Sequence, residues 1–230
     1  MMDKILDKSR QVWDDFAKKI KNQHLVFPDE SLIRIFCGNY VRVPKPPAKI
    51  LDHGFRSGNS MLFFYEKGYE VYGCEVVRSL IDVAKNAFKK FDGKAHFTLI
   101  NGTKLDYKDN FFDIIVSWNA IHYNGTKNAI QAIIAEFHRI LKPGGVLIVS
   151  TLHPTNSVLK RGKDDGYGTY VLEKTSKFDN RQGLTFYCPK THKEFMSLWK
   201  IFSEIKYGYY NFDLFQPEYS QAARLIYAIK

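Results

Sequence analysis

The amino-acid sequence predicts an α/β fold in which a doubly wound, mostly parallel sheet has helices on both faces. The first observation is that, from about residue 48, short apolar runs alternate with segments of helical periodicity, which is typical of parallel strands joined by helices. The second is that strand-like segments near 184–188, 202–210 and 222–229 stand at the end of the chain, where an antiparallel pair can close the sheet.

Before the sheet, apolar spacing predicts two helices. Residues 3–22 carry apolar side chains at helical intervals, which indicates an amphipathic lead helix, and residues 29–36 form a second, shorter one. The stretch 43–47 contains three prolines and cannot be helical, because proline lacks the backbone N–H and clashes with the preceding turn. It is interpreted as a stiff connector.

Within the alternating region we expect strands at 49–53, 70–75, 95–100, 112–117 and 146–151, and helices at 59–67, 78–91 and 126–141. Lys142-Pro143-Gly144-Gly145 ends the last helix, since proline cannot continue it and glycine takes a left-handed turn. Residues 154–183 show little periodicity and indicate a surface insertion or lid. The prediction is a single domain over 1–230. It divides into a helical cap and linker (1–47), a ligand-binding core (48–151), an insertion and substrate region (152–200) and closing strands (201–230).

Composition limits the class of protein. A hydrophobic share of 45% is typical of a globular chain, and no apolar run is long enough to span a membrane. Cys37, Cys74 and Cys188 are isolated, which argues against a disulfide framework or a zinc site. With a mixed-charge start unlike a secretory signal, these features predict a reduced, cytoplasmic protein without a metal. The net charge of +10 is compatible with a nucleic-acid partner or an anionic substrate, but the even spread of lysines favours a solvated surface.

Ligands of such sheets bind beyond the carboxyl ends of the strands, where the strand order reverses. The first strand ends in the glycine-bearing turn 52–58, which lets the backbone approach a ligand. The turn is not a dinucleotide-binding GxGxxG, because Arg56 and Asn59 occupy the second and third glycine positions. Glu75 closes the second strand, 21 residues after Gly54, where a carboxylate can accept both hydroxyls of a ribose. The glycine-bearing turn and Glu75 together predict an adenosine-containing ligand.

Three longer strings carry a resemblance to a known family. ILDHGFRSGNSMLFFYEKGYEVYGCEV resembles the first two strands of class I S-adenosylmethionine-dependent methyltransferases, and NGTKLDYKDNFFDIIVSWNAIHY resembles their adenine loop and fourth strand. HRILKPGGVLIVS is similar to a downstream marker of the family, and STLHP resembles an ending seen in its small-molecule members. The resemblance covers about residues 29–154 in the family's order. It implies a Rossmann-like, seven-stranded sheet.

The resemblance also implies a cofactor and its site. S-adenosylmethionine would be the methyl donor and S-adenosylhomocysteine the product, with transfer to an O or N atom of a small molecule, for instance one bearing a sugar or a phosphate. The resemblance implies Asp52, Gly54, Gly58 and the Ser117 backbone carbonyl for the methionine portion, Glu75 for the ribose, and Asn101 and Gly102 for the adenine. The predicted set of cofactor-binding residues also includes Arg56, Val76 and Thr103.

The sequence gives less specific signals for the residues that would bind the methyl acceptor. His122 and His153 follow the fourth and fifth strands and are candidate general bases, because imidazole titrates near neutral pH; a structural role is an equal alternative for each. Phe27, Tyr40 and Trp118 are candidate pocket walls, and Asn119 and Tyr123 candidate pocket-shaping residues.

Arg56 departs from the family pattern, since it stands where the middle glycine is expected. Its side chain either faces solvent, helps to bind an anionic acceptor, or marks a catalytically impaired protein. The sequence lacks the Pro-Pro motif that follows strand four in methylases of exocyclic DNA amines, and it lacks a Pro-Cys nucleophile near that strand. A small-molecule methyltransferase is therefore preferred. An RNA methyltransferase and a methyltransferase-like protein without activity remain the alternatives.

Overall fold

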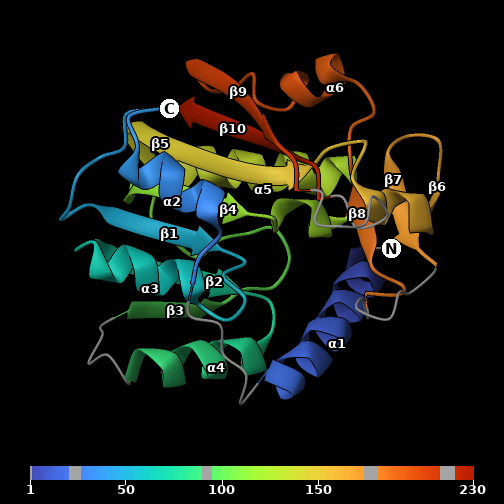
Figure 1. Ribbon diagram of the computed structural model, residues 1–230, viewed down its shortest axis with the longest axis horizontal. Coiled ribbons are helices and arrows are strands. Elements are labelled where there is room, and N and C mark those ends of the chain that lie inside the picture. The colour runs from blue at the N-terminus through green and yellow to red at the C-terminus, as the bar shows by residue number, and fades with distance from the viewer. Residues whose placement is uncertain (1, 21–26, 90–94, 174–180, 213–220) are drawn as a thin grey trace.

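The computed structural model describes residues 2–20, 27–89, 95–173, 181–212 and 221–230. Its centre is a seven-stranded sheet with the order β3-β2-β1-β4-β5-β10-β9 (Figure 1). The strands are β1 (Lys49–His53), β2 (Glu70–Glu75), β3 (Ala95–Leu99), β4 (Phe112–Trp118), β5 (Leu141–Leu152), β9 (Glu204–Tyr210) and β10 (Ala223–Ile229). Strands β1 to β5 run parallel to one another, and β10 pairs antiparallel with both β5 and β9. This confirms the predicted fold class.

Helices cover both faces because successive strand residues point to opposite sides. On one face Ile50 and Ile114 pack with α2 (Glu30–Cys37), α3 (Asn59–Glu66) and α4 (Arg78–Lys89). On the other face Leu51 and Ile115 pack with α5 (Lys127–Ile140) and with the residues at and after α6 (His192–Ser197). The near-continuous apolar strands of the sequence are thus buried on both sides, as a parallel sheet requires.

The turn after α5 is tighter than the sequence indicated. The helix ends at Ile140, and Leu141 already belongs to β5, so Lys142-Pro143-Gly144-Gly145 lies inside the first part of that strand. Gly144 has the expected left-handed backbone, with φ of 73°. The pairing of β4 with β5 shifts register between Phe112 and Ile114, which accommodates this irregular start.

The region 152–200 contains more regular structure than its sequence predicted, and the strand expected near 184–188 belongs to a second sheet instead of closing the main one. A short 3₁₀ helix, η2 (Ser157–Arg161), leads into a three-stranded antiparallel sheet of β6 (Gly162–Asp164), β7 (Thr169–Leu172) and β8 (Thr185–Tyr187). Of these strands, β8 lies beside η1 (Ile121–Asn124), the 3₁₀ turn that follows β4. This small sheet therefore flanks the carboxyl end of the main sheet.

The lead helix α1 (Met2–Ile20) crosses the same end of the molecule (Figure 1). It packs on α4 through a cluster that contains Ala17, Val77 and Leu80. The apolar face of α1 therefore packs partly on the core and partly over the carboxyl ends of the strands. Among the described residues, no helix has both the length and the apolar character needed to cross a lipid bilayer.

Candidate functional site

A cavity of about 1580 Å³ lies between the carboxyl ends of β1, β2 and β4, helix α1 and the small sheet region. It opens at the point where the strand order reverses, between β1 and β4, as expected for a doubly wound sheet. Thirteen of the residues singled out from the sequence line it: Phe27, Asp52, Gly54, Arg56, Glu75, Val76, Asn101, Gly102, Thr103, Trp118, Asn119, His122 and Tyr123.

Asp52 is the most perturbed carboxyl group of the cavity wall. Its side chain is buried, and its Oδ2 atom has no hydrogen-bond partner among the described residues. Burial, with a smaller contribution from the nearby charge of Glu75, raises the pKa of Asp52 to about 8. A buried acceptor without a donor is costly. An ammonium group bound in the cavity would supply that donor and favour the ionised form, so Asp52 fits the amino group of a methionine moiety.

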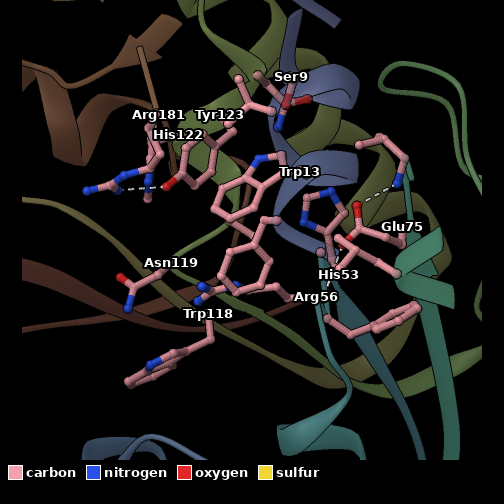
Figure 2. A pocket seen from close by; sticks show the side chains of 18 of the residues that line it. Ser9, Trp13, His53, Arg56, Glu75, Trp118, Asn119, His122, Tyr123 and Arg181 are labelled. Atoms are coloured by element: carbon pink, nitrogen blue, oxygen red, sulfur yellow. Dashed lines mark hydrogen bonds between the residues drawn. The ribbon is translucent and has the colours of Figure 1, made fainter. Parts of the chain in front are cut away.

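Glu75 is buried at the end of β2, and Figure 2 shows it in the cavity wall. Its Oε1 accepts a hydrogen bond from the Val76 backbone N–H at 2.7 Å, and its Oε2 accepts one from the Arg56 backbone N–H at 3.1 Å. Burial raises the pKa of Glu75 to about 6, although these backbone donors oppose the shift. Each carboxylate oxygen has a second lone pair. The fixed carboxylate can therefore still accept ribose hydroxyls.

The loop between β1 and α3 places the backbone close to other elements. Gly54 has φ of 69°, and a Cβ there would lie 2.6 Å from that of Ala120, so only glycine fits. Gly58 lies outside the cavity lining; it caps α3 with φ of 85°, and a Cβ would approach that of Ala84 to 3.0 Å. Gly58 thus allows the close packing of α3 on α4.

Arg56 also has a left-handed backbone, with φ of 57°. Its guanidinium lies against α1, 4.1 Å from the ring centre of Phe16 and 5.2 Å from that of Trp13 (Figure 2). The side chain therefore crosses the cavity mouth to the lead helix, while its backbone N–H holds Glu75. None of the three explanations offered from the sequence included this contact with α1.

The loop after β3 carries Asn101, Gly102 and Thr103, all at the cavity. The Asn101 side-chain oxygen accepts a hydrogen bond at 2.8 Å from Arg10, a residue of α1 whose Nε also reaches the Val76 carbonyl at 3.4 Å. The oxygen considered from the sequence as an adenine partner is thus engaged with the lead helix.

Three further predicted site residues do not line the cavity. Ser117 is buried, and its hydroxyl lies 3.0 Å from Nδ1 of His53, which does line the cavity. Tyr40 is exposed on the loop after α2. His153 hydrogen-bonds its own turn, with Nδ1 2.7 Å from the Thr155 hydroxyl. Burial, and then the charge of Arg224, lowers the pKa of His153.

His122 lies at the cavity on η1, 3.4 Å from the Thr151 hydroxyl through its Nδ1. Burial, and secondarily the charge of Arg181, lowers the pKa of His122 to about 3. The imidazole is therefore neutral throughout the physiological range, and it is a weak base.

Asn119 is held on two sides. Its amide oxygen accepts from the Ser150 hydroxyl at 2.8 Å, and its amide nitrogen donates to the Tyr210 hydroxyl at 3.2 Å. Tyr210 also lies 3.0 Å from Ser150 and stacks on Trp118, with ring centres 5.9 Å apart. Asn119 adopts φ of 51°, an unusual backbone for a non-glycine residue. This closed set of hydrogen bonds fixes an amide at the cavity wall.

Sequence reasoning missed several wall residues. The sequence places Trp13 and Phe16 on the apolar face of the lead helix, Tyr210 in a closing strand, and Arg181 in an aperiodic insertion, but all four line the cavity. Trp13 meets Tyr123 edge to face at 5.2 Å, and Arg181 donates to the Tyr123 hydroxyl at 2.9 Å (Figure 2). The aromatic stripe of the lead helix was a usable signal; Arg181 had none.

Comparisons with known proteins find methyltransferases. Residues 50–145 match the profile of a family described as methyltransferase domain. Phosphoethanolamine N-methyltransferase 3 of Arabidopsis thaliana is 29% identical over 107 residues, which are 46% of this chain and 21% of that protein. A Mus musculus protein named Probable tRNA methyltransferase 9B is 26% identical over 110 residues, 48% of this chain and 23% of its own length. The chain thus spans only about a fifth of these relatives.

A solved S-adenosylmethionine-dependent methyltransferase from Methanosarcina mazei aligns with a TM-score of 0.67 and 24% identity, over 85% of this chain and 96% of that one. At this identity the likeness supports the fold. The ordered motifs, the seven-stranded topology and the matched profile together identify a methyltransferase domain, built on the fold of class I S-adenosylmethionine-dependent methyltransferases.

Proposed function

We propose that this protein transfers a methyl group from S-adenosylmethionine to an O or N atom of a small molecule. The observation that carries the proposal is a single cavity with two different halves. One half has the carboxylates Asp52 and Glu75 at the ends of β1 and β2, and the other has Asn119, Tyr123 and Arg181 beyond β4.

When bound, S-adenosylmethionine supplies a methyl group that its sulfonium already activates. The task left to the chain is alignment, which can lower a barrier by several kcal/mol. Asp52 would accept from the donor's ammonium, and Glu75 from its ribose. Asn119 would orient the acceptor, since Ser150 and Tyr210 keep its amide from rotating.

The roof of the cavity favours a small acceptor. Helix α1 contributes Ser9, Val12, Trp13 and Phe16 to the lining and is tied to the strand loops through Arg10 and Arg56. Such a roof excludes water from the reacting atoms. It also leaves less room for a polymer than an open groove would.

The test is methyl transfer from a donor with a labelled methyl group to fractionated cell extract, after calorimetric titration with S-adenosylhomocysteine. We expect micromolar-range binding and label in the low-molecular-weight fraction. Label in RNA alone would instead support the second candidate, an RNA methyltransferase. That candidate is favoured by the similarity to the protein named Probable tRNA methyltransferase 9B and by the net charge of +10.

A further inference from the structure

We propose that Arg181, Arg56 and Tyr123 form an anion-binding subsite in the acceptor half of the cavity, which takes the phosphate or carboxylate group of the acceptor. The inference rests on the proposed function, because it assumes that this cavity binds a methyl acceptor. It names the chemistry of the molecule that is methylated, which the proposed function leaves open.

The first support is the position of Arg181. Its Nη1 donates to the Tyr123 hydroxyl at 2.9 Å, and its guanidinium lies 6.0 Å from the ring centre of Phe186. Tyr123 in turn packs edge to face on both Trp13 and Phe186, at 5.2 Å in each case. The aromatic rings therefore fix Tyr123 and leave the guanidinium of Arg181 at the cavity wall.

The second support is that Arg56 reaches the same wall from the opposite side. Trp13 contacts both the guanidinium of Arg56 and the ring of Tyr123. Arg56 is solvent-accessible, but it lines the cavity, where neighbouring protein atoms partly desolvate it. This desolvation lowers the pKa of Arg56; the nearby Tyr123 and Glu75 oppose the shift, and repulsion from Arg181 adds to it. The two positive charges are thus close enough to disfavour each other.

An anion bound between the two guanidiniums would attract both of them. Guanidinium groups donate in a planar fork that matches carboxylate and phosphate oxygens, and the Tyr123 hydroxyl offers a further polar contact. The buried carboxylates Asp52 and Glu75 line the cavity at the ends of β1 and β2, and Asp3, Asp15 and Asp29 line it from α1 and from the residue before α2. Figure 2 shows Glu75 and Arg181 on opposite sides of Trp13.

The separation of the cavity into two halves also distinguishes the two molecules that could supply the anionic group, the cofactor and the acceptor. The cofactor carries a carboxylate on its methionine portion, and an acceptor may be phosphorylated or carboxylated. Asp52 and Gly54 would place the methionine portion beside β1, whereas Arg181 comes from the segment before β8 and contacts η1. We therefore assign the subsite to the acceptor.

The test is a fluorescence titration of the full chain with inorganic phosphate, in the presence of saturating S-adenosylhomocysteine, with the tryptophans of the cavity, Trp13 and Trp118, as internal reporters. In Arg181→Met we expect the phosphate dissociation constant to rise about tenfold or more, because a charge-assisted pair of donors is lost. Arg181→Lys keeps the charge without the fork, and a smaller rise is expected. Arg34→Met, which removes an exposed arginine of α2, is the matched control and should change phosphate binding less than about twofold.

The proposal is overturned if Arg181→Met binds phosphate as the parent does, or if Arg34→Met weakens binding equally. It is also overturned if Arg181→Met weakens S-adenosylhomocysteine but not methylthioadenosine, which lacks the carboxylate, since the arginine then serves the cofactor. Tighter binding of a short 5′-phosphorylated RNA than of phosphate, lost in Arg181→Met, would overturn the small-molecule assignment. Failure of the parent chain to bind S-adenosylhomocysteine, with phosphate binding intact, would count against the proposed function and not against the anion site.

Discussion

Replacing Asp52 by asparagine should stabilise the folded protein at high pH while weakening cofactor binding. The carboxyl group has a pKa of about 8 in the folded state against 3.8 in its ordinary range, chiefly because it is buried. Between these values the folded state holds a proton that the unfolded state has released. The free energy of unfolding contributed by Asp52 is therefore greatest below about pH 4, and it declines as pH rises to about 8.

The size of the effect follows from the same shift. Each pH unit within the window costs up to about 1.4 kcal/mol, so raising the pH from 5 to 7 removes at most about 3 kcal/mol that the asparagine variant keeps. Urea unfolding followed by circular dichroism at pH 5, 6, 7 and 8 measures the difference. The exposed Asp106→Asn variant is the control, and it should track the parent at every pH.

A stability difference between Asp52→Asn and the parent that stays constant from pH 5 to 8 would refute this reasoning. So would an unchanged affinity for S-adenosylhomocysteine. Loss of a charged acceptor for an ammonium group should raise the dissociation constant about tenfold or more, since such hydrogen bonds contribute about 1.5–3 kcal/mol. The two effects have opposite signs, which separates a role in binding from general damage to the fold.

Three other substitutions test neighbouring parts of the site. Glu75→Gln should raise the dissociation constant of S-adenosylhomocysteine about tenfold by calorimetry, because the neutral amide accepts ribose hydroxyls less strongly; an unchanged value would remove Glu75 from the ribose site. Arg56→Gly relieves a left-handed backbone, worth about 1 kcal/mol, and loses cation–π contacts of about the same size, so the unfolding free energy should change little. Cofactor binding by the glycine form alone would identify the natural chain as impaired. Tyr210→Phe removes one of the two hydrogen bonds that hold the Asn119 amide and should slow methyl transfer severalfold with cofactor affinity kept; equal losses in both would contradict an acceptor-side role.

The sheet and its cofactor end could be predicted because they follow from local order along the chain. Strand and helix periods set the sequence of elements, and parallel strands bring their carboxyl ends to one edge. Asp52 and Glu75 end adjacent strands, so their proximity required no knowledge of distant packing. The cavity confirms that both lie at one wall, while their ligands remain predictions.

The acceptor half could not be predicted in the same way, because its contacts join distant parts of the chain. Asn119 meets Tyr210 across 91 positions, and Arg181 meets Tyr123 across 58. Trp13 looked like an ordinary helix-core residue, since an apolar stripe does not reveal whether it packs on a core or over a cavity. Tyr40 illustrates the converse: an aromatic residue near the site in sequence lies exposed in space.

The electrostatics of the cavity bear on which atom receives the methyl group. A hydroxyl acceptor must lose its proton during attack and gains from a base whose pKa is near 7, whereas an uncharged amine attacks with its own lone pair. His122, the imidazole closest to the acceptor half, has a pKa of about 3 and is a poor base, and His153 lies outside the lining. Among the described residues of the lining, the groups with a pKa near neutrality are instead Asp52 and Glu75, at the cofactor end. Methyl transfer should therefore follow the ionisation of the acceptor rather than of an imidazole. The His122→Asn variant should keep the shape of the rate–pH profile, and loss of an inflection between pH 6 and 7 in that variant would restore His122 as the base.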